Sequence, residues 1–187
     1  MFPILRQIAR IGCITEPAPA ADDALRVTQQ RLDAAMRTKL GRALVIRHVD
    51  AGSCNACELE IHALGNPYYN LEALGIKFAA SPRHADLLLV TGPVAKNMEV
   101  ALRRAYDATP EPRLVVAVGD CGCTGGLFGE SYASCGKVAN VIPVDVAIPG
   151  CPPTPLDLMR GILAALGGGD GDSIEAAADT PIAPTQP

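Results

Sequence analysis

Three short apolar runs, each followed closely by a turn that contains glycine and cysteine, constrain the fold of this chain most strongly. The runs cover residues 43–49, 114–118 and 144–148, and each is typical of a buried β-strand. The carboxyl ends of parallel strands share one edge of an open sheet, where such folds bind their ligands. We therefore expect the cysteines that follow the runs to converge on one site. These cysteines are Cys54, Cys57, Cys121 and Cys151.

The chain between residues 42 and 166 alternates between strand-like and helix-like segments. This alternation predicts an α/β domain with a mostly parallel open sheet and helices on both faces. A glycine-rich loop over residues 119–137 carries three of the cysteines. Strands are expected at residues 43–49, 75–79, 86–90, 114–118 and 141–148, and helices at residues 55–64, 97–108 and 155–166.

The two ends of the chain differ from this central domain, which we assign to residues 42–166. Residues 1–41 are expected to form an N-terminal helical extension, and residues 167–187 a disordered tail rich in Gly, Asp, Ala and Pro. Residues 1–12 show the helical spacing of apolar residues, with two arginines between them. Such a helix packs on its own domain, lies on a membrane surface or docks on a partner subunit, and we favour the partner subunit.

A Pro/Ala linker at residues 15–21 leads to a second expected helix, which runs to about Leu40 and is stopped by Gly41. Asp22 and Asp23 are suited to cap its first turn. The apolar seam of this helix is narrow, and a short helix of this kind is not stable alone. It must dock either on its own domain or on another subunit.

Composition limits the classes of function. The net charge is −4 and lysine and arginine are not clustered, so no nucleic-acid partner is expected. No apolar run approaches the roughly 18 residues needed to span a bilayer, and no secretory signal is visible, so we expect a cytoplasmic location. Seven cysteines in such a chain favour metal or redox chemistry over structural disulfides.

The four converging thiols match the chemistry of an iron–sulfur cluster, in which each iron takes one thiolate. A Cys-x-x-Cys pair such as Cys54 and Cys57 also occurs in thioredoxin-like dithiols and in zinc sites. A redox dithiol needs no further cysteines at neighbouring strand ends. Zinc also takes four thiolates, although structural zinc sites more often use two local pairs, and this alternative stays open at the level of the residues.

Other residues near these cysteines have weaker signals. Cys123 is expected to be a neighbour of the site or incidental to it, and Cys135 to be structural. Glu60 follows Cys57 by about one helical turn and has the type of side chain that relays protons, although the residues alone favour a solvated helix position. His84 could accept a redox-linked proton, because the imidazole of histidine titrates near neutrality in general, but a hydrogen-bonded loop residue explains it equally well.

Five separated motifs occur in order along the central domain: Asp50–Glu60, Ser81–Asp86, Gly119–Gly122, Ile142–Asp145 and Ile148–Pro153. They resemble the motifs of the small subunits of membrane-associated, group 4 nickel–iron hydrogenases. The formate hydrogenlyase type is the best comparison, and the B-type 20 kDa subunit of respiratory NADH:quinone oxidoreductase is similar. The resemblance spans about residues 44–166.

The resemblance implies a flavodoxin-like domain that holds one [4Fe-4S] cluster through Cys54, Cys57, Cys121 and Cys151. It also implies an electron-transfer role beside a hydrogenase large subunit with the nickel–iron centre, a ferredoxin-like iron–sulfur subunit and integral membrane subunits. The resemblance therefore implies that the protein is peripheral and lies on the cytoplasmic side of the inner membrane. Glu60 matches a carboxylate that recurs in the hydrogenase motif, which favours its role as a proton relay.

The spacing of the first two cysteines separates the two relatives. The respiratory subunit resembles this chain but uses adjacent cysteines, whereas Asn55 and Ala56 stand between Cys54 and Cys57, as in the hydrogenases. The hydrogenase subunit is therefore the primary hypothesis. A subunit that passes electrons to quinone, and a zinc-stabilised scaffold protein, are the alternatives.

Overall fold

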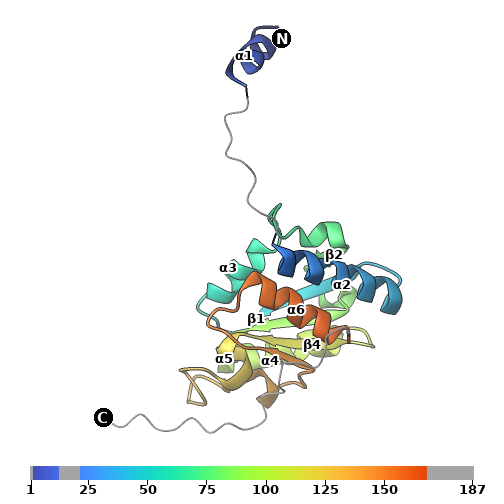
Figure 1. Ribbon diagram of the computed structural model, residues 1–187. Helices are drawn as coiled ribbons and strands as arrows, with labels where there is room; N and C mark the ends of the chain where they lie inside the picture. Colours follow the sequence, from blue (N-terminus) through green and yellow to red (C-terminus); the bar gives the residue numbers. More distant parts are fainter. Residues whose placement is uncertain (1, 13–21, 168–187) are drawn as a thin grey trace.

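The computed structural model describes residues 2–12 and 22–167, and its centre is a five-stranded parallel sheet (Figure 1). The strand order is β2-β1-β3-β4-β5, so the chain leaves β1 for one edge and then crosses back to build the other side. This order puts a topological switch point between β1 and β3. The strands are β1 (Leu44–Asp50), β2 (Ile76–Phe78), β3 (Leu87–Thr91), β4 (Leu114–Val118) and β5 (Val146–Ile148).

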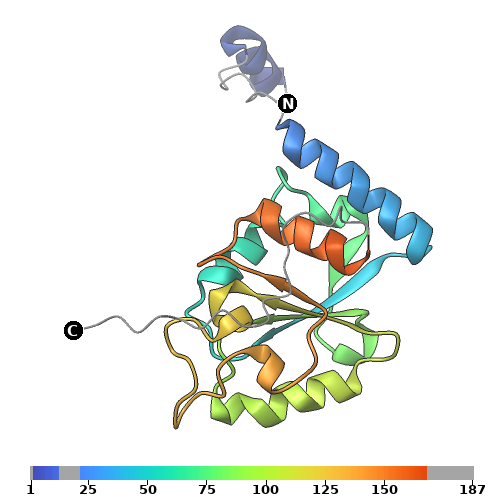
Figure 2. The ribbon, with the colours of Figure 1, turned by 60° about the horizontal axis from the view of Figure 1, so that its bottom comes forward.

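Helices cover both faces of the sheet, which confirms the predicted flavodoxin-like α/β fold. Figure 2 shows α4 (light green) on one side of the sheet and α2 and α6 (blue and orange) on the other. Alternate side chains of β3 supply the two cores: Leu87 and Leu89 pack with α2 and α6, whereas Leu88 and Val90 pack with α4. The helices are α1 (Phe2–Ile11), α2 (Asp23–Lys39), α3 (Ala56–Ala63), α4 (Lys96–Ala108), α5 (Gly119–Thr124) and α6 (Pro155–Ala165).

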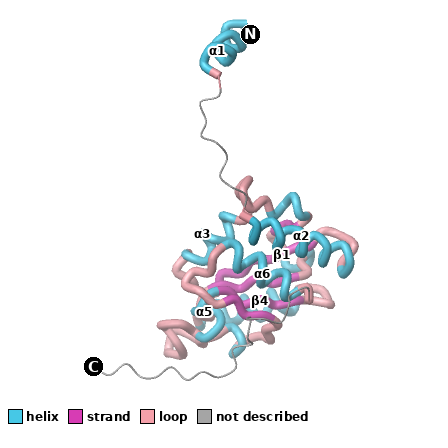
Figure 3. Tube along the Cα trace, in the orientation of Figure 1, coloured by secondary structure: helices cyan, strands magenta, loops and turns pink. Residues whose placement is uncertain are grey.

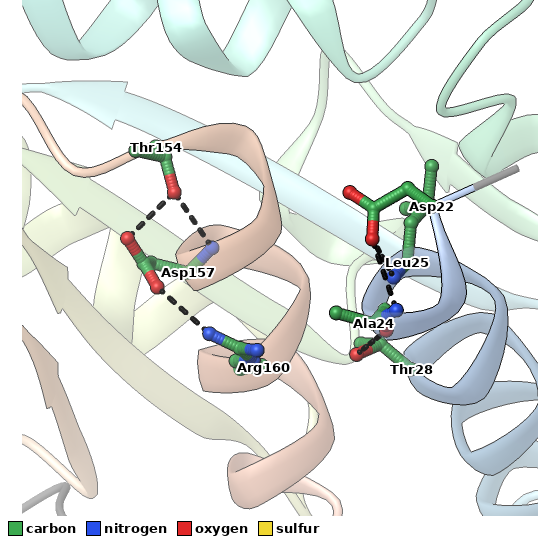
Figure 4. Close-up of polar contacts among 7 residues, drawn as sticks. All are labelled: Asp22, Ala24, Leu25, Thr28, Thr154, Asp157 and Arg160. Carbon is green, nitrogen blue, oxygen red and sulfur yellow. Dashed lines mark hydrogen bonds and ion pairs between the residues drawn. The ribbon is translucent and has the colours of Figure 1, made fainter. Parts of the chain in front are cut away.

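Helices α2 and α6 lie side by side, and polar side chains define where each begins (Figure 4). The Asp22 carboxylate accepts hydrogen bonds from the backbone N–H groups of Ala24 and Leu25, at 2.9 and 3.2 Å. The Thr154 hydroxyl accepts one from the Asp157 N–H at 3.3 Å. These caps satisfy N–H groups that have no partner inside a helix.

Helix α2 docks on its own domain, which is one of the two alternatives that the sequence left open. Leu25, Leu32 and Met36 are buried, and all three belong to the core that includes α6 and β1. The narrow seam seen in the sequence is thus covered by this chain.

The structure corrects two expected segments. The strand expected at residues 141–148 is limited to β5, because Pro143 has no N–H for a strand ladder and the chain instead turns to bury Val141 and Ile142. The glycine-rich loop begins with the short helix α5, which the sequence did not predict. The other strands and helices lie within two residues of the expected bounds.

Helix α1 stands apart from the sheet domain in Figure 1, and the side chains of Ile4, Leu5, Ile8 and Ile11 are exposed. Packing on its own domain, one of the three alternatives above, is therefore not what the structure shows. Within residues 2–12 and 22–167, no helix is both long and apolar enough to cross a membrane. The expected linker, Cys13 and the expected disordered tail lie outside the described residues.

Candidate metal centre

The cysteine loops meet at the carboxyl edge of the sheet, where α3 and α5 follow β1 and β4. Figure 3 shows α3 and α5 at the same end of the molecule. The loops come from three strands that are far apart in the sequence but lie together in the parallel sheet. We call the four thiols of these loops the edge thiols; they belong to Cys54, Cys57, Cys121 and Cys151.

An aspartate at the end of β1 holds the first loop in shape. One carboxylate oxygen of Asp50 accepts hydrogen bonds from the N–H groups of Gly52 and Ser53, both at 2.8 Å. The Ser53 hydroxyl accepts the N–H of Asn55 at 3.2 Å. These bonds, and Asn55 in the left-handed region with φ of 74°, turn the chain sharply between Cys54 and α3.

A second aspartate joins the two remaining loops. The backbone N–H of Asp120 donates to the Gly150 carbonyl at 2.9 Å, and its carboxylate accepts the Gly150 N–H at 2.7 Å. Asp120 directly precedes Cys121 and Gly150 directly precedes Cys151. The pair of bonds therefore fixes these two cysteines relative to each other.

Two glycines lie against the sulfur atoms with no room for a side chain. A Cβ at Gly119 would lie 2.7 Å from the Sγ of Cys57, and a Cβ at Gly126 would lie 2.9 Å from the Sγ of Cys121. Both glycines also have positive φ, at 79° and 54°. Backbone thus closely approaches the sulfurs, as it does where N–H groups surround the sulfurs of a cluster.

The edge thiols influence one another electrostatically. Burial raises the pKa of the Cys57 thiol to about 12, and Glu58 and the thiols of Cys54, Cys121 and Cys151 add to the increase. Burial also raises the pKa of Cys121, with contributions from Cys151, Cys54 and Asp120. The edge thiols differ in their exposure to solvent: Cys57 is buried, Cys121 is half-buried, and Cys54 and Cys151 are exposed.

The donor set fits a cluster that takes one thiolate per iron, because the loops at this edge carry four cysteines and the backbone of two glycines lies close to their sulfurs. In the described part of the chain, no group of three or more His, Cys, Asp or Glu side chains is arranged to hold a metal ion. The assignment of the edge thiols as ligands therefore stays a prediction.

Two further cysteines, Cys123 and Cys135, make hydrogen bonds away from the edge thiols. The Cys123 thiol is buried in the core under α4 and lies 3.6 Å from the Ala117 carbonyl, to which it donates. Cys135 is buried in the same core and donates to the Glu99 carboxylate at 3.3 Å. Neither contact involves the edge thiols.

The acid–base residues selected from the sequence lie in different places. Glu60 is half-buried on α3, next to the cysteine loop, where its charge helps to raise the pKa of Tyr69 after burial and Tyr68. His84 is exposed and shortly precedes β3, which puts it at the amino edge of the sheet. His84 and the edge thiols thus lie at opposite edges of the sheet.

Sequence reasoning missed a buried polar group beside Cys57. The side chain of Glu58 is only 9% exposed, and neither of its carboxylate oxygens has a hydrogen-bond partner among the described residues. Nε2 of His48 lies 3.6 Å from a Glu58 oxygen and 3.0 Å from the Thr91 hydroxyl. Burial lowers the pKa of His48, although Glu58 and Asp50 oppose this. The sequence feature that could have indicated this group is His48, which lies on the same face of β1 as the buried Leu44 and Ile46.

The fold and this edge define a class: α/β proteins with the flavodoxin-like strand order whose carboxyl edge gathers cysteines from several loops. Residues 54–165 match the family described as NADH ubiquinone oxidoreductase, 20 Kd subunit. The chain belongs to this family, which confirms the resemblance inferred from the motifs, and the family consists of oxidoreductase subunits.

Relatives within this family carry both types of name. Formate hydrogenlyase subunit 7 of Escherichia coli is 43% identical over 73% of this chain, and the match covers 53% of that relative. The B-type subunit of the NADH-quinone oxidoreductase of Desulfovibrio desulfuricans is 48% identical over 66% of this chain and 66% of its own length. This chain thus spans only about half the length of the first relative.

A solved structure agrees with the fold. A chain of the membrane-bound sulfane sulfur reductase, described as an archaeal respiratory membrane complex, aligns with a TM-score of 0.59 and 32% identity. The alignment covers 76% of this chain and 79% of the other.

Proposed function

We propose that this chain is the electron-transfer small subunit of a group 4 nickel–iron hydrogenase and that its edge thiols hold one [4Fe-4S] cluster. The observation that carries the proposal is the meeting of three cysteine loops at one edge of the sheet. A cluster bound there would supply one-electron transfer. The net reaction of the whole enzyme would be the reversible conversion of two protons and two electrons into H₂.

The residues of this chain have distinct parts in that role. Asp50 and Asp120 hold the cysteine loops in place through their hydrogen bonds to backbone N–H groups. Gly119 and Gly126 keep side chains away from the sulfurs. Burial and the neighbouring thiols keep Cys57 protonated in the metal-free chain, so iron binding must release its proton.

Glu60 is the proposed proton relay. It lies on α3, the helix that begins at the Cys57 loop, and its half-buried position leaves the carboxylate within reach of solvent or a partner surface. A carboxylate in that position could pass protons along the rim of the site while the catalytic metal is held by another subunit.

The proposed assembly contains the partners that the resemblance implies. A large subunit would carry the nickel–iron centre, a ferredoxin-like subunit would carry further clusters, and integral membrane subunits would attach the whole on the cytoplasmic side. The sheet domain up to residue 166 would hold the cluster, and α1 would lie outside the cluster-binding part of the chain. Relatives named for membrane-bound and respiratory complexes support this arrangement.

A subunit that delivers electrons to quinone is the second candidate, because the relatives include an NADH-quinone oxidoreductase subunit with 48% identity. The two residues between Cys54 and Cys57 favour the hydrogenase. The sequence of the large subunit would distinguish the two candidates. Two separated cysteine pairs in it would indicate nickel binding, and their absence would indicate quinone chemistry.

The cluster is tested on protein purified without oxygen. We expect iron and acid-labile sulfide in equal amounts, a broad brown absorbance, and a paramagnetic resonance signal on reduction. A colourless protein that contains zinc would instead support the scaffold alternative and reject the relay.

The ligand assignment is tested with a pair of serine variants. Cys151→Ser should abolish or cripple the cluster, since it removes an edge thiol. Cys135→Ser is the matched control, because the Cys135 thiol donates to Glu99 on the other side of the sheet, and it should keep full iron content. Full clusters in both variants would show that the ligand set is wrong.

A further inference from the structure

Helix α1 presents an apolar stripe that no described part of the chain covers. Ile4, Leu5, Ile8 and Ile11 are 65%, 59%, 59% and 53% exposed. Figure 1 shows α1 apart from the sheet domain. Four large aliphatic side chains on ten residues form an unusually apolar surface for a helix that faces water.

The stripe and the charges occupy opposite sides of α1. Ile4, Ile8 and Ile11 follow the spacing of four and three residues that brings side chains onto one helical face. Arg6 and Arg10 are four residues apart and share the opposite face. This arrangement gives α1 a sharply amphipathic character.

The charge of α1 also differs from that of the rest of the chain. Residues 1–12 contain two arginines and no acidic residue, although the whole chain has a net charge of −4. A basic amphipathic helix attached to an acidic protein is suited to an anionic surface.

We propose that α1 binds directly to the surface of an anionic lipid bilayer. Its aliphatic stripe lies at the boundary between headgroups and acyl chains, and Arg6 and Arg10 lie at the level of the lipid phosphates. The composition of the stripe favours lipid over a protein partner. Its exposed members are all aliphatic, whereas the anchors of protein interfaces are mostly Trp, Tyr and Arg in central positions.

This binding does not depend on the proposed redox role, because α1 shares no residue with the candidate metal centre. A helix of ten residues with two basic side chains gives weak and reversible attachment. It would therefore supplement other membrane contacts.

Vesicle sedimentation with the full chain tests the proposal. We expect the chain to sediment with vesicles of phosphatidylcholine and phosphatidylglycerol, and much less with phosphatidylcholine alone. Binding to the anionic vesicles should decrease as salt rises, because salt screens exposed charges beyond about 10 Å at 0.1 M. Absence of binding to anionic vesicles at low salt, or equal binding to both kinds of vesicle, would overturn the proposal.

Two variants separate the apolar stripe from charge alone. Ile8→Asp and Gln7→Asp each add one negative charge to α1, but only Ile8 belongs to the stripe. Ile8→Asp should reduce partition to anionic vesicles about tenfold, and Gln7→Asp only about twofold. Neither should change urea unfolding of the sheet domain. Equal losses in the two variants, or capture of α1 by a protein subunit without any vesicle binding, would contradict the proposal.

Discussion

At the scale of single residues, Gly119 has two separate reasons to be glycine. Its φ is +79°, and a Cβ would meet the Cys57 sulfur at 2.7 Å. Gly129 shares only the first reason, since its φ is +52° and nothing lies within 4 Å of a Cβ there. The two positions therefore separate the effect of backbone strain from that of crowding at the sulfur.

Gly119→Ala should lower the free energy of unfolding by more than the roughly 1–2 kcal/mol expected for a non-glycine residue in the left-handed region. It should also lower the iron content. Gly129→Ala should lower the free energy of unfolding only by this penalty for a left-handed backbone, and it should leave iron binding intact. Urea unfolding and iron analysis on both variants check this. Equal iron content in the two would show that the space beside the Cys57 sulfur is not required.

Glu58 and Glu60 are two carboxylates of one helix in unlike surroundings. Glu58 is buried without a hydrogen-bond partner among the described residues, and Glu60 is half-buried. A buried carboxylate without hydrogen bonds is destabilising, and His48 at 3.6 Å is held toward its neutral form by burial.

Glu58→Gln should therefore raise the free energy of unfolding at pH 8 by about 1 kcal/mol, because the neutral amide avoids the burial of a charge. Glu60→Gln should change it by less than about 0.5 kcal/mol. Chemical unfolding curves measure both. A loss of stability in the Glu58 variant would mean that its carboxylate has a strong stabilising partner in the folded protein.

At the scale of elements, two aspartates fix the starts of strands in the same way. Asp86 donates its N–H to the Val45 carbonyl at 2.8 Å, while its carboxylate accepts the Val45 N–H at 3.1 Å. Asp145 repeats this with Val115, at 2.9 and 2.7 Å. These contacts tie β3 to β1 and β5 to β4, and they give a structural reason for aspartate at the end of two of the recognised motifs.

Asp145→Ala should reduce the free energy of unfolding by roughly 1–2 kcal/mol, since the Val115 N–H loses a charged acceptor. Asp107→Ala is the control, because Asp107 is exposed on α4, and it should be within about 0.5 kcal/mol of the parent chain. Thermal or urea unfolding distinguishes the two. Similar values would mean that backbone pairing alone sets the position of β5.

At the scale of the whole molecule, α2 belongs energetically to the sheet domain. Its buried side chains complete the core on the α6 face, whereas the side chains of α1 that the structure describes lie outside both cores. Of the N-terminal extension expected at residues 1–41, α2 therefore packs as a covering layer of the sheet domain.

Removal of residues 1–21 should leave the free energy of unfolding within about 0.5 kcal/mol of the full chain. Leu32→Ala, at a fully buried position of α2, should lower it by roughly 2–5 kcal/mol. Val27→Ala on the exposed side of α2 is the matched control and should have little effect. A large loss from the truncation would show that α1 supports the domain.

Much of the fold could be predicted because its signals are local. The apolar run at β4 has the predicted bounds, and the turns after β1, β4 and β5 carry cysteines as expected. The start of one expected strand was wrong, because Pro143 interrupts the apolar run and Val141 and Ile142 are buried outside the sheet.

The amino-acid sequence by itself determined the α/β class, the alternation of elements and the placing of cysteines after strands, because hydrophobic period and turn residues act over a few neighbouring positions. Only the tertiary structure decided that α2 covers its own sheet, that Glu58 rather than Glu60 is buried, and that His84 lies at the far edge. Each of these depends on contacts between segments that are distant in the chain. Such contacts are set by the packing of the whole molecule, so no local pattern records them.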